Sequence, residues 1–280
     1  MGFRKNINTI ALKMPRAVAG YRAVIKLLNN QLRQQHVAMF HSGRCGSSVI
    51  GMMLNAHSDI YWGGEVFNRY MNTDKKKGLE SDKFVEQTLE WSRSATVSKV
   101  YGFETKYLSS LHLSRRCIDM ELLDYLHCFS DLQFTKFIVL HRENYLRRTI
   151  SGEVGRKTKF WHTTQDSVQP TKVKVDISSI KTGENYIPLL DSFRHVDENF
   201  TRLKKDLADY NALFLTYEDD ILIDPIIAYN KICDFLDLPG EEPEVPLGRT
   251  NPFRYEEMVE NFDEIVEILR DTKYEWMLNC

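Results

Sequence analysis

The sequence predicts an α/β fold of three layers, in which a central, mainly parallel sheet is flanked by helices. Short apolar runs that are typical of buried strands alternate along the chain with longer segments whose apolar residues recur at helical spacing. Two of these runs lead through small or charged residues straight into a helix, as the strands of a parallel sheet do. The chain has 280 residues, of which 42% are hydrophobic, so it can bury one sizeable core.

The alternation assigns most of the chain to strands or helices. Strands are expected at residues 37–40, 60–62, 100–107, 137–140 and 212–216. After the helix that follows the first strand, further helices are expected at residues 82–94, 122–129, 144–159, 186–210, 225–236 and 251–269. Residues 162–183 lose helical periodicity and predict a long loop with a short strand at 173–177, of the kind that covers a ligand.

Residues 1–35 form a separate basic segment with amphipathic helical spacing. No Asp or Glu precedes Asp59, whereas eight Lys or Arg residues do. Such a helix either packs on the main domain with a solvated basic face or contacts a membrane surface or an acidic partner. Its charges recur too often for a transmembrane span, and no secretory signal is expected. The scattered cysteines are expected to be reduced thiols, which predicts a cytoplasmic protein.

The overall charge and the cysteines exclude several classes of protein. The formal net charge is −2, so no nucleic acid partner is expected. The cysteines are scattered, odd in number and without a C-x-x-C pair, so neither a disulfide framework nor a zinc site is expected. The histidines at 112, 127, 162 and 195 show no metal-ligand spacing, and no metal is assigned.

The most informative stretch is residues 37–54, where an apolar strand breaks into a loop of small residues and resumes as an apolar helix. Glycines allow the loop to turn tightly, and serines place hydroxyls beside the first free N–H groups of the helix. Arg44 adds a fixed charge that can hold an anion with two directed hydrogen bonds. An ordinary strand-to-helix turn is the alternative. The candidate anion ligands are Ser42, Gly43, Arg44, Cys45, Gly46, Ser47 and Ser48.

This loop is not a Walker A sequence, which would have lysine where Ser47 stands. The order Arg44-Cys45-Gly46-Ser47-Ser48 instead resembles the [RK]-x-G-[ST]-[ST] loop with which sulfotransferases hold the 5′-phosphosulfate of 3′-phosphoadenosine 5′-phosphosulfate (PAPS). The resemblance spans roughly residues 36–271 and implies a P-loop-like fold, with a catalytic domain at residues 36–280. It also implies PAPS as sulfuryl donor, 3′,5′-adenosine bisphosphate (PAP) as product, and transfer without a metal.

Residues 137–151 are the second block that resembles this family. A buried strand is expected to deliver Arg142 to its carboxyl end, and the next helix to return Ser151 beside it. This resembles the sulfotransferase site for the 3′-phosphate, an arginine at a strand end followed by a serine. The interval from Arg142 to Ser151 is one residue longer than is usual there. Either the turn accommodates the extra residue, or Thr149 or a backbone group replaces the serine.

Later residues extend the resemblance. Residues 216–220 and 235–238 resemble a late sulfotransferase segment whose role is mainly structural. Arg249 stands where the family closes a basic loop over the 3′-phosphate, although a surface arginine is an equal alternative. For Arg147 and Arg148 we expect a solvated helix face, with one of them flanking the nucleotide as the alternative.

Sulfuryl transfer needs a base for the acceptor proton and donors for the charge that grows on the sulfonate. Arg44 and the two serines suit the second task. The segment containing Glu65 resembles the G-E-x-F segment of bacterial carbohydrate sulfotransferases, which implies that Glu65 is the base; a helix cap is the alternative. His41 is the rival base. The family often has lysine where Glu104 stands. Lys106 lies two residues further along the same strand face and is expected to take the place of that lysine.

The sequence therefore predicts a PAPS-dependent sulfotransferase acting on a hydroxyl or amine of a carbohydrate or small-molecule acceptor. A P-loop nucleotide kinase or NTPase is one alternative. A catalytically silent nucleotide-binding protein at a membrane surface is the other, and the basic N-terminal segment is its best support.

Overall fold

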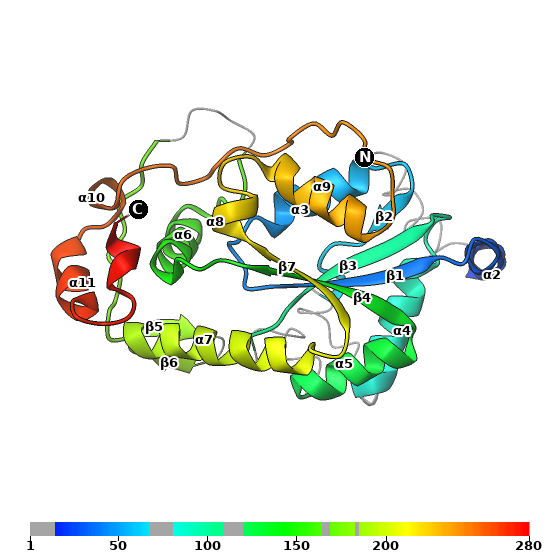
Figure 1. Ribbon diagram of the computed structural model, residues 1–280, viewed down its shortest axis with the longest axis horizontal. Helices are drawn as coiled ribbons and strands as arrows, with labels where there is room; N and C mark the ends of the chain where they lie inside the picture. Colours follow the sequence, from blue (N-terminus) through cyan, green and yellow to red (C-terminus); the bar gives the residue numbers. More distant parts are fainter. Residues whose placement is uncertain (1–14, 68–80, 109–119, 164–168, 183–184, 280) are drawn as a thin grey trace.

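The computed structural model describes residues 15–67, 81–108, 120–163, 169–182 and 185–279. Within them a parallel sheet of five strands has the order β2–β3–β1–β4–β7 (Figure 1). The strands are β1 (Gln35–His41), β2 (Ile60–Trp62), β3 (Val100–Lys106), β4 (Phe134–His141) and β7 (Asn211–Thr216). The predicted α/β fold with a central parallel sheet is confirmed.

β1 is the middle strand because its residues are apolar on both faces. All four residues from Val37 to Phe40 are completely buried, as a strand covered by helices on both sides requires. The register sets the last residue, His41, opposite Lys106 of β3 and Leu140 of β4. The carboxyl ends of the central strands therefore meet at one edge of the sheet.

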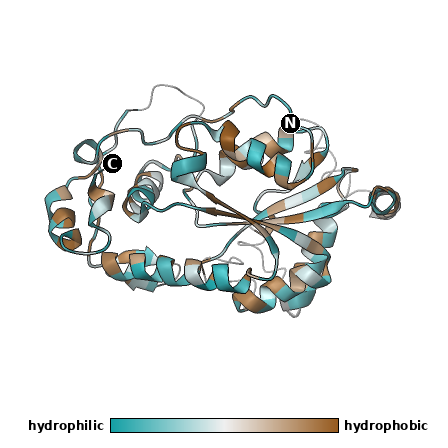
Figure 2. Cartoon of the chain, in the orientation of Figure 1, coloured by the Kyte–Doolittle hydropathy of each residue, from teal (hydrophilic) through white to brown (hydrophobic). Residues whose placement is uncertain are grey.

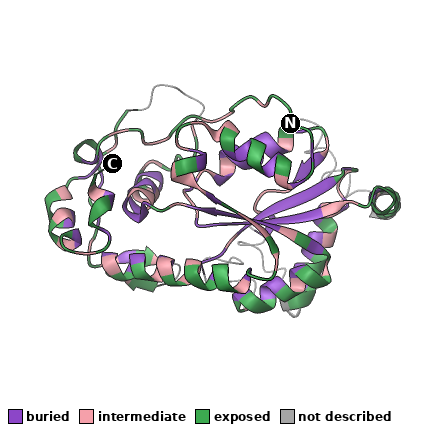
Figure 3. Ribbon diagram, in the orientation of Figure 1, coloured by how far each residue is buried: buried purple, intermediate pink, exposed green. Residues whose placement is uncertain are grey.

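Two layers of helices cover the sheet, and each encloses a separate apolar cluster (Figures 1–3). The helices on one face are α3 (Ser47–Ala56) and α9 (Pro225–Phe235); those on the other are α4 (Ser81–Arg93), α5 (Leu122–Asp131) and α7 (Leu189–Asp206). At the carboxyl edge lie α6 (Tyr145–Thr158) and α8 (Tyr217–Asp220), with α10 (Tyr255–Met258), α11 (Phe262–Leu269) and η2 (Glu275–Leu278) beyond.

The single helix expected at residues 251–269 is wrong. Helices α10 and α11 are separated at Val259, whose backbone is extended (φ −121°, ψ 130°) and forms a parallel bridge with Val173. Asn261 then accepts a hydrogen bond from the Val175 backbone at 3.0 Å. The strand expected at 173–177 is reduced to this single bridge. Residues 173–175 pair with the short break between α10 and α11 and not with another strand.

The helix expected at 186–210 begins later, at Leu189. Pro188 is its N-cap residue, and the residues before it pair in an antiparallel ladder of β5 (Ile180–Thr182) with β6 (Asn185–Ile187). Tyr186 is thus in a strand, where local pairing prevails over the helical spacing of the sequence.

Helix α2 (Pro15–Gln31) contacts α4 through its basic residues. The Arg22 guanidinium lies 3.3 Å from the centroid of the Trp91 ring, and Lys26 Nζ is 3.1 Å from Glu90 Oε1. The predicted membrane contact also involves the basic residues at positions 4, 5 and 13, which lie outside the described residues. No helix among the residues that the structure describes has the length and apolarity needed to cross a membrane.

Asp224 provides a test of how α9 begins. Its side chain accepts a hydrogen bond from Ile226 N at 2.9 Å, and Pro225 occupies the first helical position. Asp224→Ala should lower the free energy of unfolding by about 1 kcal/mol, whereas Asp224→Asn should nearly preserve it because asparagine caps equally well. Urea unfolding measures both; equal losses in the two variants would contradict the capping role.

Candidate functional site

The β1–α3 loop, residues 42–46, joins β1 to α3 through three residues with positive φ. These are Gly43 (73°), Arg44 (55°) and Gly46 (85°), the last of which is the N-cap residue of α3. A Cβ on Gly46 would lie only 2.9 Å from Ile221 Cγ2, so glycine is needed there for space as well as for conformation. The loop therefore presents the amino end of a helix, where N–H groups have no partner within the helix, at the carboxyl edge of the sheet.

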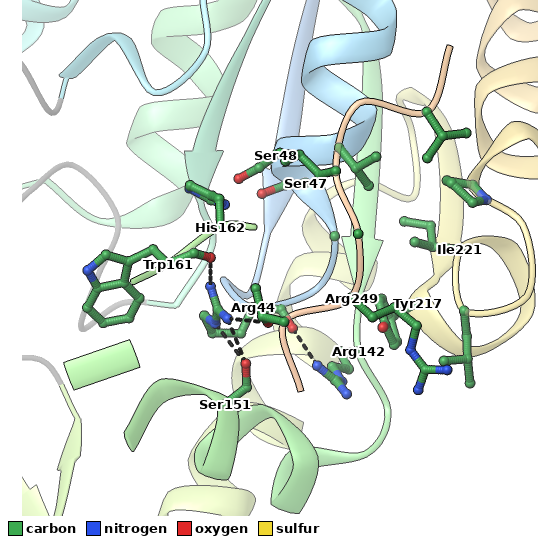
Figure 4. A pocket seen from close by; sticks show the side chains of 18 of the residues that line it. Arg44, Ser47, Ser48, Arg142, Ser151, Trp161, His162, Tyr217, Ile221 and Arg249 are labelled. Atoms are coloured by element: carbon green, nitrogen blue, oxygen red, sulfur yellow. Dashed lines mark hydrogen bonds between the residues drawn. The ribbon is translucent and has the colours of Figure 1, made fainter. Parts of the chain in front are cut away.

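The Arg44 side chain reaches from this loop to α6 and to the C-terminal part of the chain (Figure 4). Its Nε and Nη2 donate to Ser151 Oγ at 2.9 and 2.8 Å, and Nη2 also donates to Thr250 Oγ1 at 3.1 Å. Nη1 donates to the Trp161 carbonyl at 2.7 Å. Arg44 is thus fixed among polar groups that come from distant parts of the sequence.

Arg142 lies beside the same loop, at the end of β4. Its Nη1 donates to the Arg44 carbonyl at 2.9 Å, and its guanidinium carbon is 4.2 Å from the centroid of the Tyr217 ring. Its Nε is buried without a hydrogen-bond partner and is 3.9 Å from Glu218 Oε1. Burial lowers the pKa of Arg142, so a nearby anion would relieve an unfavourable charge.

The longer interval after Arg142 does not remove Ser151 from the site. Ser151 lines the pocket together with Arg142 and bonds to Arg44. Asn251 Nδ2 also donates to its Oγ, at 3.3 Å. Thr149 is buried and lies on neither of the two pockets at this edge. Between the two hydroxyl candidates, the geometry favours Ser151.

Two adjoining pockets of about 280 and 210 Å³ open here, a size that suits parts of one ligand of nucleotide dimensions. The first includes Ser47 and Ser48, and the second extends past Asn144. Arg249 is exposed and borders both, where residues 248–250 are held by a bridge between Gly248 and Thr163. The residues that both pockets share are Arg142, Ser151, Tyr217, Leu222, Arg249 and Thr250.

The remaining loop residues lie behind the pocket. Ser42 and Cys45 are buried, and burial raises the pKa of the Cys45 thiol, so it packs as a small neutral side chain. Gly43 does not border either pocket, and a Cβ there would lie 3.6 Å from Lys106 Cε. These residues shape the loop, while Arg44, Gly46, Ser47 and Ser48 face the cavity.

The expectation that Arg147 and Arg148 form a solvated helix face is wrong. Both are partly buried. Arg148 Nη1 donates to the Ser42 carbonyl at 3.1 Å and so braces the β1–α3 loop from behind. Arg147 Nη1 donates to the Phe253 carbonyl at 2.6 Å and its guanidinium stacks on Tyr255. The helix they belong to is covered on this side by the C-terminal segment, which the local sequence does not indicate.

Sequence reasoning missed Trp161, Thr250 and Asn251, and it treated His162 as background, although all four lie near Arg44 or Ser151. A signal for Trp161 exists: a Cβ on Gly155 would lie 2.7 Å from its ring, so the glycine makes room for the indole against α6. Thr250 and Asn251 follow Arg249 in the predicted basic loop, where no pattern reveals that they turn toward Ser151.

A second polar cluster lies on the other side of the loop, around the end of β1. His41 is buried, with Nε2 3.6 Å from Glu65 Oε1 and 4.0 Å from Glu104 Oε2. Lys106 Nζ donates to Glu65 Oε2 at 2.9 Å. The three predicted catalytic groups other than Arg44, namely His41, Glu65 and Lys106, therefore lie together.

The two buried members of this cluster have shifted pKa values. Burial lowers the pKa of His41 to about 4, so its imidazole is neutral at pH 7. Burial, with a smaller contribution from the Glu65 charge, raises the pKa of Glu104 to about 7 against the opposing hydrogen bond from Trp62. A histidine with so low a pKa is a weak base, which leaves the partly exposed Glu65 as the better placed proton acceptor.

Comparison with solved structures finds a likeness to a sulfotransferase from Alicyclobacillus acidocaldarius. The identity is 12% and the TM-score 0.46, over 88% of this chain and 96% of that chain. No family model matches the chain, and no curated protein matches its sequence. At this identity and TM-score the likeness gives no argument about activity, which has to come from the site itself.

Gly46 provides a test of the loop geometry, with Gly64 as its matched control. Both glycines have positive φ, 85° and 66°, which disfavours alanine by roughly 1–2 kcal/mol. Only at Gly46 would the new Cβ also meet Ile221; at Gly64 nothing lies within 4 Å. Urea unfolding should therefore show a larger loss for Gly46→Ala than for Gly64→Ala.

The excess should shrink in an Ile221→Ala background, because the contact that generates it is then absent. An unchanged penalty in that background would show that Ile221 does not limit the loop.

Proposed function

We propose that this protein is a PAPS-dependent sulfotransferase. The proposal is supported above all by one observation: Arg44, Arg142 and Ser151, from a β1–α3 loop, a strand end and a helix, converge on the same pocket. Two guanidinium groups and a helix amino end suit a ligand with more than one phosphate-like group. Both blocks of sequence that resemble sulfotransferases contribute to this pocket.

The donor would lie across the pocket with its 5′-phosphosulfate at the helix amino end formed by Ser47 and Ser48. Its 3′-phosphate would be held by Arg142 and Ser151, with Arg249 at the exposed border. Arg44 belongs to the loop at the phosphosulfate end, while its carbonyl accepts from Arg142 and its side chain bonds to Ser151 at the 3′-phosphate end. Arg44 would therefore connect the two ends of the donor site.

In the transfer, an acceptor oxygen or nitrogen forms a bond to sulfur as the bond from sulfur to the phosphate oxygen breaks, and PAP leaves. Arg44 and the helix amino end would stabilise charge on the sulfonate and the bridging oxygen. Glu65 would take the acceptor proton, with Lys106 holding its second oxygen. None of these roles requires a metal.

A carbohydrate or another small molecule with a hydroxyl or amine is the proposed acceptor, and the cytoplasm is the proposed location. We also propose that the basic N-terminal segment contacts a membrane surface, on the ground of its charge alone.

Nucleotide binding is the direct test. PAP should raise the melting temperature by several degrees, because a ligand at 100 times its Kd stabilises the folded state by about 2.7 kcal/mol. ATP with magnesium should give a much smaller shift. Stabilisation by ATP with magnesium and not by PAP would contradict the proposal and favour a kinase or NTPase.

Ser151→Ala should weaken PAP binding roughly tenfold or more, since it removes a hydrogen bond to a charged group. Thr158→Ala, on the same helix, is the matched control: its hydroxyl bonds to the Val154 carbonyl at 2.9 Å and borders neither pocket. Equal PAP affinities in the two variants would remove Ser151 from the site.

Glu65→Gln tests the base. Transfer of radiolabelled sulfate from PAPS into metabolite extracts, in the presence of a chelator, first identifies an acceptor. On that acceptor the variant should lose roughly 100-fold or more of its turnover while keeping its affinity for PAP. Glu241→Gln, a surface carboxylate bonded to Ser58, should keep wild-type turnover. Turnover retained by Glu65→Gln would assign the proton transfer to another group.

A further inference from the structure

Three donor atoms from three different elements converge at the end of β1. They belong to His41 at the last position of β1, Glu65 just after β2, and Glu104 within β3, and all lie within 4.8 Å of one another. His41 and Glu104 are almost completely buried, whereas the Glu65 side chain is 29% exposed. The cluster is therefore enclosed by the protein around His41 and Glu104 and open to solvent on the side of Glu65.

His41 is the unusual member, because both of its ring nitrogens are buried without a hydrogen-bond partner. Its side chain is only 1% exposed, so water cannot satisfy them from the bulk. Leaving a buried polar group unpaired is unfavourable by roughly 1–3 kcal/mol, and native structures usually satisfy such groups. The Nε2 atom points between the two carboxylates, which indicates a missing partner at that place.

One oxygen of each carboxylate is held by a neighbouring side chain. Trp62 Nε1 donates to Glu104 Oε1 at 2.8 Å, and Lys106 Nζ donates to Glu65 Oε2 at 2.9 Å. The other oxygen of each, Glu104 Oε2 and Glu65 Oε1, is the one that lies near His41 Nε2. Carboxylates that bind metal ions are typically oriented in this way by hydrogen bonds to the atom that does not ligate.

We propose that His41, Glu65 and Glu104 form a binding site for a divalent transition-metal ion, with zinc as the preferred ion. One imidazole nitrogen with two carboxylate oxygens is a zinc-type donor set, whereas calcium and magnesium prefer oxygen ligands alone. The exposed side of Glu65 leaves a fourth position for water.

The cluster is somewhat wider than an occupied zinc site. Bond lengths of about 2.0–2.1 Å in a tetrahedron place ligands roughly 3.4 Å apart. The His41 to Glu65 distance of 3.6 Å already approaches this, and the His41 to Glu104 distance is 4.0 Å. The His41 to Glu104 distance is the one that must shorten when an ion binds, by a small movement of these two buried side chains. Glu65, which is partly exposed, can follow.

Zinc at this site would occupy the oxygen of Glu65 that faces away from Lys106. If Glu65 is the base of the proposed reaction, the ion would compete with the acceptor proton, and micromolar zinc would inhibit transfer. This consequence rests on the proposed function. The site itself does not.

Zinc titration of the chelator-treated full-length protein against a chromophoric chelator, without nucleotide, tests the site. Wild type should bind one zinc ion per chain in competition with the chelator, and Glu65→Gln should bind it at least roughly tenfold more weakly. Glu104→Gln is the second variant and should have the same effect. Cobalt(II) should give the d–d absorption of a four-coordinate site with wild type and not with Glu65→Gln or Glu104→Gln.

Glu241→Gln is the matched control, because it alters a second His–Glu pair that has no available nitrogen. His57 Nδ1 is 3.7 Å from Glu241 Oε1, but it accepts from Asp59 N at 3.0 Å, and Nε2 is 3.0 Å from the Pro239 carbonyl. This variant should bind zinc as wild type does. Absence of stoichiometric zinc binding by wild type, or equal binding by Glu65→Gln and Glu104→Gln, as cysteine ligation would give, overturns the proposal.

PAP binding, measured with chelator present, is independent of this titration. Failure of one therefore does not imply failure of the other.

Discussion

The parallel register of β1 between β3 and β4 is the constraint on which the rest of the structure depends. It places His41 beside Lys106 and Leu140, so the groups that follow or end these strands meet at one edge. The β1–α3 loop begins directly after His41, and Arg142 begins the segment after β4. Since side chains alternate along a strand, a shift of β1 by one residue would turn His41 to the other face and dismantle the carboxylate cluster.

Three partly buried guanidinium groups lie around the loop, and their positive charges favour an anion in the pocket. Arg44, Arg142 and Arg148 all have pKa values lowered mainly by burial, and repulsion from Arg142 contributes at both Arg44 and Arg148. Neighbouring buried cations are unfavourable unless hydrogen bonds or an anion compensate them. Carbonyl oxygens accept hydrogen bonds from part of each guanidinium group, but Nε of Arg142 and Nε of Arg148 have no hydrogen-bond partner. An anion at this edge would lower the electrostatic energy of all three.

Local sequence was sufficient for the five strands of the parallel sheet and for the residues at their ends, because those follow from hydrophobic period and from glycine placement. It did not reveal the β5–β6 ladder or the break between α10 and α11, which depend on backbone pairing. It was sufficient for Ser151 only as one of two alternatives, since the turn after Arg142 decides which hydroxyl faces the pocket. It could not reveal that Asn251 turns toward α6, or that Arg148 braces the loop, because these contacts join segments about a hundred residues apart. Local sequence likewise does not reveal that His41 lies near Glu65 and Glu104, because the pairing of the strands brings these residues together.

Lys106 links the two halves of this edge. Its Nζ pairs with Glu65, while its Cε lies close to Gly43 of the β1–α3 loop, where any Cβ would lie 3.6 Å away. A charge on a bound anion and the charge on Glu65 would therefore both interact with the same ammonium group. Stronger attraction of Lys106 toward a loop-bound anion would weaken its hold on Glu65 and make that carboxylate a better base. The same hydrogen bond would orient Glu65 in the proposed metal site, so the proposed proton transfer and the proposed metal binding would both depend on it.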